Sequence, residues 1–175
     1  RTIVQTSEGA LPFQEYFVKR QCEPPVTGFD FVGAEQAVPA APVRAAIESG
    51  DVDGVILCPS NPYVSIAPII AIPAVHDFLS NCGLPVIAVS PIVGGRALKG
   101  PAARMMHDLG VPSSAYSIAE HYRELVTGMV IDTLDQSDAE AIGSLGMQVK
   151  VTNTVMTSNA EKTALARDVL DFIRS

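Results

Sequence analysis

Residues 54–65 read Gly-Val-Ile-Leu-Cys-Pro-Ser-Asn-Pro-Tyr-Val-Ser, an apolar run followed directly by a polar, proline-rich segment. The apolar part, residues 55–57, predicts a strand buried on both faces, as in the middle of a parallel sheet. Pro59 and Pro62 fix the backbone and push the residues before them out of the helical region. The sequence therefore predicts a stiff loop at the carboxyl end of a central strand, where open α/β sheets bind ligands. An ordinary strand-to-helix turn explains the local sequence equally well.

The composition predicts one folded domain and does not exclude an anionic small ligand. The 175 residues are 47% hydrophobic and 18% charged, with a net charge of -7. Such a chain can bury a sizeable core, and its acidity argues against nucleic acid or an anionic membrane as a partner. It contains no run of about 18 apolar residues that could span a bilayer. Three cysteines without metal-ligand spacing favour reduced thiols in a cytoplasm.

Strand and helix patterns alternate along the chain from Phe29 onward. The predicted strands are 29–32, 54–57, 84–89, 129–131 and 148–152, and the predicted helices are 43–49, 67–81, 101–109, 114–125, 138–145 and 159–173. This alternation, without a hairpin signal, predicts an α/β fold with a Rossmann-like, mostly parallel sheet and helices on both faces. Upstream, residues 2–6 predict a strand and residues 11–20 a short amphipathic helix. No linker interrupts the pattern, so residues 1–175 are expected to form a single α/β domain.

Two polar loops follow neighbouring predicted strands, and their positions predict a shared site at one edge of the sheet. The residues expected to bind substrate or nucleotide are Ser60, Asn61, Pro62, Ser65, Ser90, Gly94, Gly95, Arg96 and Lys99. Glycines allow a ligand to approach the backbone closely, and successive N–H groups can form an anion-binding nest. The two cations could add charge-assisted bonds to phosphate oxygens. We therefore expect a diphosphate or nucleotide here, although neither a Walker A motif nor a dinucleotide fingerprint is present and a solvated loop is the alternative.

The remaining polar candidates are weaker. His76, His107 and His121 are far apart in the sequence and lack the pairing that metal ligation by histidine needs. His121, beside Tyr122, is more typical of a packed helix residue than of a catalyst. Asp132 ends a predicted strand, where it could bind a ribose or a metal or could cap the following turn. No catalytic residue is assigned from these patterns.

Five segments together resemble the 2-phospho-L-lactate transferase family. They are Glu-Gly-Ala-Leu-Pro-Phe-Gln-Glu-Tyr-Phe-Val (8–18), Cys-Pro-Ser-Asn-Pro-Tyr-Val-Ser-Ile (58–66), Ala-Val-Ser-Pro-Ile-Val-Gly-Gly-Arg-Ala-Leu-Lys-Gly-Pro-Ala (88–102), Ala-Glu-His-Tyr (119–122) and Val-Thr-Asn-Thr-Val-Met (151–156). The resemblance implies transfer of a phospholactyl or phosphoenolpyruvyl group from a guanosine-diphosphate-activated donor. The acceptor would be the ribityl hydroxyl of 7,8-didemethyl-8-hydroxy-5-deazariboflavin, a deazaflavin. GMP would leave, Mg²⁺ would be the cofactor, and the product would belong to coenzyme F-420 biosynthesis.

This sequence departs from the family at its beginning. Family members are about twice this length, within the range of large domains, and they begin with a strand, a glycine-rich phosphate loop and acidic residues implicated in metal and deazaflavin binding. The present chain has no initiator methionine and none of those features. The resemblance thus implies a C-terminal half, inactive alone and with an exposed apolar edge on its sheet. The Mg²⁺ ligands would lie in the missing N-terminal half and none in this half, and a homodimer is expected.

A second interpretation of the sequence is that the chain belongs to a non-catalytic binding protein. Residues 59–66 also resemble, more distantly, a loop in gluconeogenesis-linked regulators that bind nucleotide sugars without known turnover. The segments 88–102 and 8–18 favour the transferase. The sequence leaves open whether the donor carries a lactyl, enolpyruvyl or glyceryl group.

Overall fold

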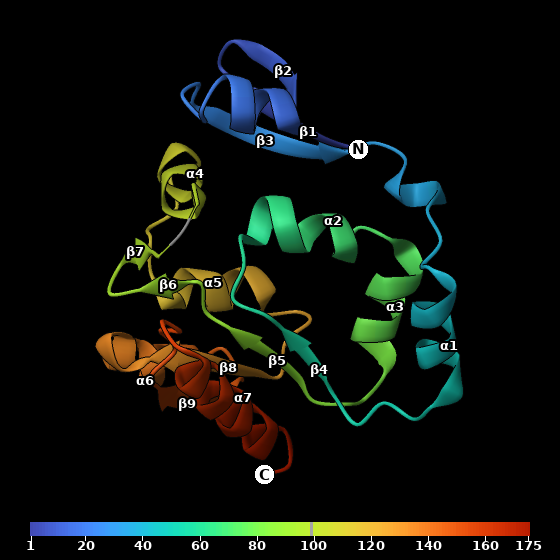
Figure 1. Ribbon diagram of the computed structural model, residues 1–175, viewed down its shortest axis with the longest axis vertical. Helices are drawn as coiled ribbons and strands as arrows, with labels where there is room; N and C mark the ends of the chain where they lie inside the picture. Colours follow the sequence, from blue (N-terminus) through green and yellow to red (C-terminus); the bar gives the residue numbers. More distant parts are fainter. Residues whose placement is uncertain (99) are drawn as a thin grey trace.

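A four-stranded parallel sheet forms the body of the molecule. The computed structural model describes residues 1–98 and 100–175, and its main sheet has the order β4-β5-β8-β9 (Figure 1). The strands are β4 (Val55–Leu57), β5 (Val86–Val89), β8 (Gly128–Asp132) and β9 (Gln148–Thr152), and each neighbouring pair is parallel. This confirms the predicted α/β, Rossmann-like fold.

The centre of this sheet lies at β5 and β8, and β4 lies at its edge. Every residue of β5 and β8 is buried, as their unbroken apolar runs lead one to expect. In β4, by contrast, Ile56 is 37% exposed and its two neighbours are half-buried. The prediction of a central strand buried on both faces is therefore wrong for residues 55–57, because an apolar run does not specify the position of its strand in the sheet. Ile56 gives this edge of the sheet an exposed apolar side chain.

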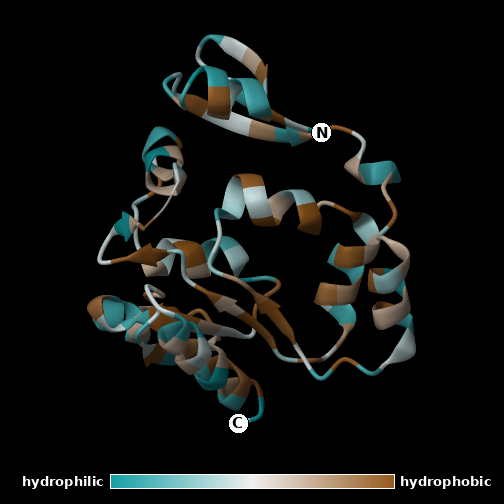
Figure 2. Cartoon of the chain, in the orientation of Figure 1, coloured by the Kyte–Doolittle hydropathy of each residue, from teal (hydrophilic) through white to brown (hydrophobic). Residues whose placement is uncertain are grey.

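Helices cover both faces of the sheet. The helical elements are α1 (Ala41–Ser49), η3 (Pro62–Ile66), α2 (Ala67–Ile70), α3 (Pro73–Asn81), α4 (Ala102–Asp108), α5 (Ala115–Tyr122), η4 (Thr133–Asp138), α6 (Ala139–Gly143) and α7 (Asn159–Ile173). Alternate side chains of β5 point to opposite faces. Val86 and Ala88 join the larger core, which includes residues of α3 to α6, whereas Ile87 and Val89 pack with α7. Figure 2 shows β4 and β5 in hydrophobic colours.

The first 31 residues build a separate antiparallel layer, here called the N-terminal layer. Its sheet has the order β2-β1-β3, with β1 (Thr2–Thr6), β2 (Gly9–Pro12) and β3 (Val26–Phe31). A π-helical turn, η1 (Glu15–Lys19), follows β2, and a 3₁₀ turn, η2 (Ala34–Gln36), follows β3. The predicted helix over residues 11–20 is thus wrong for its first two residues. The hairpin between β1 and β2 was not predicted, because Ser-Glu-Gly is a weak hairpin signal.

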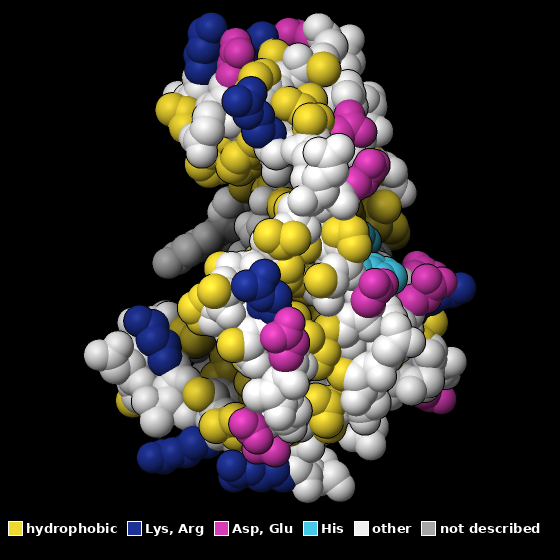
Figure 3. All heavy atoms as spheres, turned by 90° about the vertical axis from the view of Figure 1, so that its right-hand side faces the viewer, with side chains coloured by type: hydrophobic (Ala, Val, Ile, Leu, Met, Phe, Trp, Pro, Cys, Tyr) yellow, Lys and Arg dark blue, Asp and Glu magenta, His cyan; other side chains and the backbone are white. Residues whose placement is uncertain are grey.

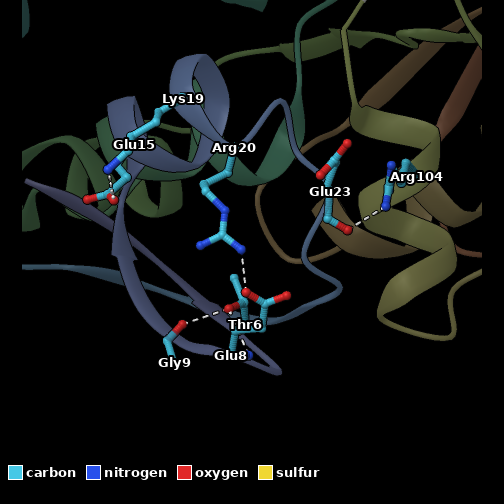
Figure 4. A network of polar contacts seen from close by, with 8 residues as sticks. All are labelled: Thr6, Glu8, Gly9, Glu15, Lys19, Arg20, Glu23 and Arg104. Atoms are coloured by element: carbon cyan, nitrogen blue, oxygen red, sulfur yellow. Dashed lines mark hydrogen bonds and ion pairs between the residues drawn. The ribbon is translucent and has the colours of Figure 1, made fainter.

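Polar contacts from α4 attach the N-terminal layer to the body. The Arg104 guanidinium donates to the Glu23 carbonyl at 2.6 Å (Figure 4), and the Asp108 carboxylate accepts the Val26 N–H at 3.1 Å. Within the layer, an ion pair joins Arg20 to Glu8. Phe29 of the layer also stacks on Tyr63 of η3, with ring centroids 5.4 Å apart, so both α4 and η3 hold the layer beyond the carboxyl end of the parallel sheet.

The surface outside these contacts mixes apolar and charged side chains. Figure 3 shows such a mixture on the side that carries α1 and α3. Helix α1 has no buried residue, and Val38, just before it, is 74% exposed. Across residues 1–98 and 100–175, no single helix has the length and apolar character to cross a membrane. One pair bent by 88°, Pro62–Ile70 with Pro73–Asn81, meets that test by length and composition only.

Candidate functional site

A cavity of about 370 Å³ lies at the carboxyl ends of β4 and β5, where the N-terminal layer meets the parallel sheet. Four separate segments supply its walls. The lining residues are Phe13 and Phe17 of the N-terminal layer; Pro59, Ser60, Asn61, Val64 and Ser65 after β4; Ser90, Pro91, Val93, Leu98, Gly100, Pro101 and Ala102 after β5; and Thr154 and Met156 after β9. The position agrees with the general rule that open α/β sheets bind ligands beyond the carboxyl ends of their strands.

The segment after β4, residues 59–65, contributes two serines to the lining of this cavity. Ser60 and Ser65 are both half-buried, and neither hydroxyl has a hydrogen-bond partner within the described part of the chain. A serine hydroxyl can donate one hydrogen bond and accept two. These two side chains therefore offer hydrogen-bonding capacity that the fold itself does not use.

Asn61 lines the same wall, but its side chain shapes the loop. Its Oδ1 accepts the N–H groups of Tyr63 at 2.9 Å and Val64 at 3.2 Å, which makes it the N-cap of η3. Its Nδ2 donates to the Met105 sulfur at 3.3 Å. Pro62 occupies the first position of η3, where a missing N–H costs nothing, and it is buried outside the cavity wall.

Ser90 lies on the wall after β5, and its polar atoms are satisfied within the protein. The residue is 1% exposed, and its N–H donates to the Val130 carbonyl at 2.9 Å. Its hydroxyl donates to the Ile92 carbonyl at 3.0 Å and accepts the Ile92 N–H at 3.1 Å. These bonds fix the turn by which the chain leaves the sheet.

Beyond Ser90 the chain forms a small hairpin, which the sequence did not predict. Strands β6 (Ile92–Val93) and β7 (Arg96–Ala97) are antiparallel and are joined by Gly94 and Gly95, with φ of +57° and +75°. Positive φ at both central residues is the requirement of a type I′ turn, which accounts for the glycine pair. Neither glycine, nor Arg96, is among the described residues that line the cavity. Lys99 lies outside the described residues.

The Gly94 N–H group already binds an anion from within the protein. It lies 3.0 Å from both carboxylate oxygens of Asp135 in η4. The turn thus has the anion-binding character that its glycines indicated, but the anion is a side chain of the same molecule. Burial, together with the charges of Asp138 and Asp132, raises the pKa of Asp135, although the Gly94 bond opposes this effect.

Asp132, at the end of β8, is the second buried carboxylate of this region. One oxygen accepts the Leu134 N–H at 3.0 Å, and the other accepts the Thr154 N–H at 2.8 Å and the Thr154 hydroxyl at 3.1 Å. Burial raises the pKa of Asp132, but the hydrogen bonds outweigh it and hold the pKa below its ordinary value. Of the roles that the sequence left open, capping of the following turn is the one that the geometry shows.

Histidine and metal chemistry find no support at the site. The His121 ring lies edge-on to Tyr63 at 5.4 Å and to Tyr122 at 4.9 Å, and burial lowers its pKa. It is a packed helix residue, as predicted. Among the residues for which the structure gives positions, no cluster of three or more His, Cys, Asp or Glu side chains could hold a metal ion.

Sequence reasoning missed the aromatic part of the wall. Phe13 and Phe17 stack with ring centroids 5.5 Å apart, and Phe17 is 43% exposed. Thr154 and Met156, which also line the cavity, were missed as well. A signal was present, because the segments 8–18 and 151–156 both carry the family resemblance.

Four of the five segments that carry the resemblance meet at this one cavity, and comparison with known proteins agrees with it. The family model described as 2-phospho-L-lactate transferase CofD matches residues 1–169. The chain belongs to this family. The 2-phospho-L-lactate transferase of Methanosarcina acetivorans is 37% identical over 169 residues, 97% of this chain and 54% of that protein. The phosphoenolpyruvate transferase of Streptomyces griseus is 37% identical over 164 residues, 93% of this chain and 51% of that protein.

The family is one of transferases, and the chain spans about half the length of the curated relatives it matches. The same holds for the 2-phospho-L-lactate transferase of Methanopyrus kandleri, which is 36% identical over 172 residues, 98% of this chain and 54% of that protein. The resemblance noted from the sequence is thereby confirmed at the level of the family.

Proposed function

We propose that the cavity binds substrate for the transfer of a phospholactyl or phosphoenolpyruvyl group from a guanosine-diphosphate-activated donor to the ribityl hydroxyl of a deazaflavin, with release of GMP. One observation carries this proposal. Segments that are far apart in the sequence and that carry the family resemblance supply the walls of a single cavity. If these segments served only to pack the core, they would not need to surround a cavity.

The cavity lining contains the two kinds of surface that suit the chemical groups of these substrates. Phe13, Phe17 and Met156 provide an apolar surface, against which a flat ring system can pack. Ser60 and Ser65 provide hydroxyl groups for hydroxyl or phosphate oxygens. An amphipathic ligand with a ring system and a polar chain could contact both kinds of residue, and a deazaflavin with its ribityl chain is such a ligand.

The reaction places most of its demands on positioning and charge. In the transfer, the acceptor oxygen forms a bond to phosphorus, the bond to the leaving GMP oxygen breaks, and the hydroxyl proton is released. Such a step needs in-line geometry and charge neutralisation more than covalent catalysis. The residues of this chain would orient the acceptor and exclude water. Mg²⁺ would neutralise phosphate charge, but the described residues do not fit a Mg²⁺ site, so no step is assigned to it here.

The cellular location and the assembly of the protein are part of the same proposal. Its net charge of -7 suits a small-molecule enzyme better than a binder of nucleic acid or of an anionic membrane surface. We place it in the cytoplasm as a homodimer.

Titration of the 175-residue chain with the deazaflavin tests the proposal, because this acceptor absorbs visible light and fluoresces. We expect saturable quenching of its fluorescence, lost when Phe17 is replaced by Ser and kept when the exposed Val18, on the same turn, is replaced by Ser. Calorimetry with guanosine diphosphate gives the second measurement. Binding of nucleotide without deazaflavin would support the non-catalytic alternative, and binding of neither would overturn the proposal.

A further inference from the structure

Two buried carboxylates, Asp132 at the end of β8 and Asp135 in the following turn η4, contact two of the segments that form the cavity wall. Asp135 reaches the β6–β7 hairpin, which follows the wall residues Ser90 and Pro91, and Asp132 reaches Thr154 on the wall after β9. Asp135 and Asp132 are 6% and 2% exposed. Residues 132–135 therefore connect two parts of the wall that belong to distant parts of the sequence.

The contact to the hairpin is the more specific of the two. Both oxygens of Asp135 face the same N–H group, that of Gly94, at 3.0 Å. Gly94 directly follows Val93, whose side chain lines the cavity. The Leu134 side chain also lies against the turn, with its Cδ1 3.6 Å from the position of a Cβ on Gly94. Strands β6 and β7 are only two residues long each, and the other anchors of the hairpin are the buried side chains of Ile92 and Val93 and the bonds between Ser90 and Ile92.

The carboxylate at this position is not what stability alone would favour. A buried carboxylate is costly to ionise, and Asp138 and Asp132 add like charges nearby. An asparagine would avoid that cost and could still accept one hydrogen bond from Gly94. The asparagine oxygen is an uncharged and therefore weaker acceptor, however, and the Nδ2 group beside it is a donor that cannot accept the Gly94 N–H.

We propose that Asp135 is a positioning residue for substrate binding, which sets the place of the cavity wall at residues 90–98 by holding the Gly94 turn. This inference rests on the proposed function in that the cavity is taken as the substrate site. Asp135 does not touch the substrate. It acts through Gly94 and Val93, and Asp132 holds another part of the wall through Thr154.

Replacement of Asp135 by Asn tests the proposal, and Asp138→Asn is the matched control. Asp138 lies on the same turn and accepts one backbone N–H, that of Tyr116 at 3.2 Å, from α5 instead of the hairpin. In ¹⁵N-labelled chain without ligand, we expect the Gly94 amide of the Asp135→Asn variant to lose its downfield shift and to exchange with solvent at least tenfold faster. The deazaflavin should then bind about tenfold more weakly, whereas Asp138→Asn should leave both readouts near wild type.

The outcomes separate the two proposals. Unchanged affinity together with a released Gly94 amide would overturn the positioning role, and so would an unchanged amide. Equal losses in both variants would show a general structural effect and would also overturn it. If the wild-type chain binds neither deazaflavin nor guanosine diphosphate, the proposed function fails. The exchange measurement then still decides whether Asp135 holds the wall.

Discussion

The loop after β4 and the loop after β5 differ in how their polar groups are used. Both contain serine and proline, and both reach the same cavity. In the first loop, the hydroxyls of Ser60 and Ser65 have no partner among the described residues. In the second, the hydroxyl of Ser90 and the N–H of Gly94 are bonded inside the protein. The first loop therefore offers contacts to a ligand, and the second builds the wall that faces it.

The largest expected effect comes from the framework of the second wall. Asp132→Ala would leave the N–H groups of Leu134 and Thr154 and the Thr154 hydroxyl without their acceptor in a buried site. We expect a loss of about 3 kcal/mol or more in the free energy of unfolding, measured by urea denaturation. A loss below about 1 kcal/mol would show that water replaces the carboxylate at no great cost.

The Asp132 carboxylate should make the free energy of unfolding decrease at low pH. Because the folded-state pKa of Asp132 lies below its ordinary value of 3.8, its contribution is complete above that pH and is lost as the pH falls through the folded pKa. Denaturation at pH 7 and pH 3 should therefore show a smaller difference between Asp132→Asn and wild type at the lower pH.

Replacement of Gly95 by Val should have the next largest effect. The Gly95 φ of +75° is strained for a β-branched residue, and the nearest atom to an added Cβ, the Ser113 carbonyl oxygen, is at an ordinary 3.5 Å. The cost is thus conformational, about 2 kcal/mol in the free energy of unfolding. Gly95→Asn is the control, since asparagine tolerates this region, and equal losses in both variants would point to steric contact instead.

Asn61→Ala should cost about 1 kcal/mol, because it removes the cap of η3. Asn61→Asp keeps the accepting oxygen and should restore most of the stability in thermal unfolding. A melting temperature unchanged in the alanine variant would contradict the capping role. In that case the Asn61 side chain would be available to bind a ligand.

The smallest effect on stability is expected at the two hydroxyls of the first loop. Ser60→Ala and Ser65→Ala should each change the free energy of unfolding by less than about 0.5 kcal/mol. Each should weaken deazaflavin binding several-fold, since about 1 kcal/mol is the typical net value of one hydrogen bond. If these alanine variants lost stability but kept their affinity for the deazaflavin, the two serines would be structural and would not be ligand contacts.

Local sequence determined much of the fold and the family of this protein. The fully apolar runs at 86–89 and 129–131 become the buried strands β5 and β8, and residues 159–173 form α7. Patterns of this kind succeed because periodicity and burial are local properties of the chain. The segments that carry the family resemblance likewise contain most of the residues that line the cavity.

Tertiary structure alone decided which strand lies at the edge and which polar groups remain available to a ligand. The apolar run 55–57 resembles that of β5, yet only the pairing of strands places β4 at the sheet edge. Gly94 and Asp135 are 41 residues apart, and Thr154 and Asp132 are 22 apart. Spacing cannot reveal such pairs, because they form only when separate segments are brought together by packing. The sequence therefore does not show whether the polar groups of a loop serine or glycine are bonded within the protein or available to a ligand.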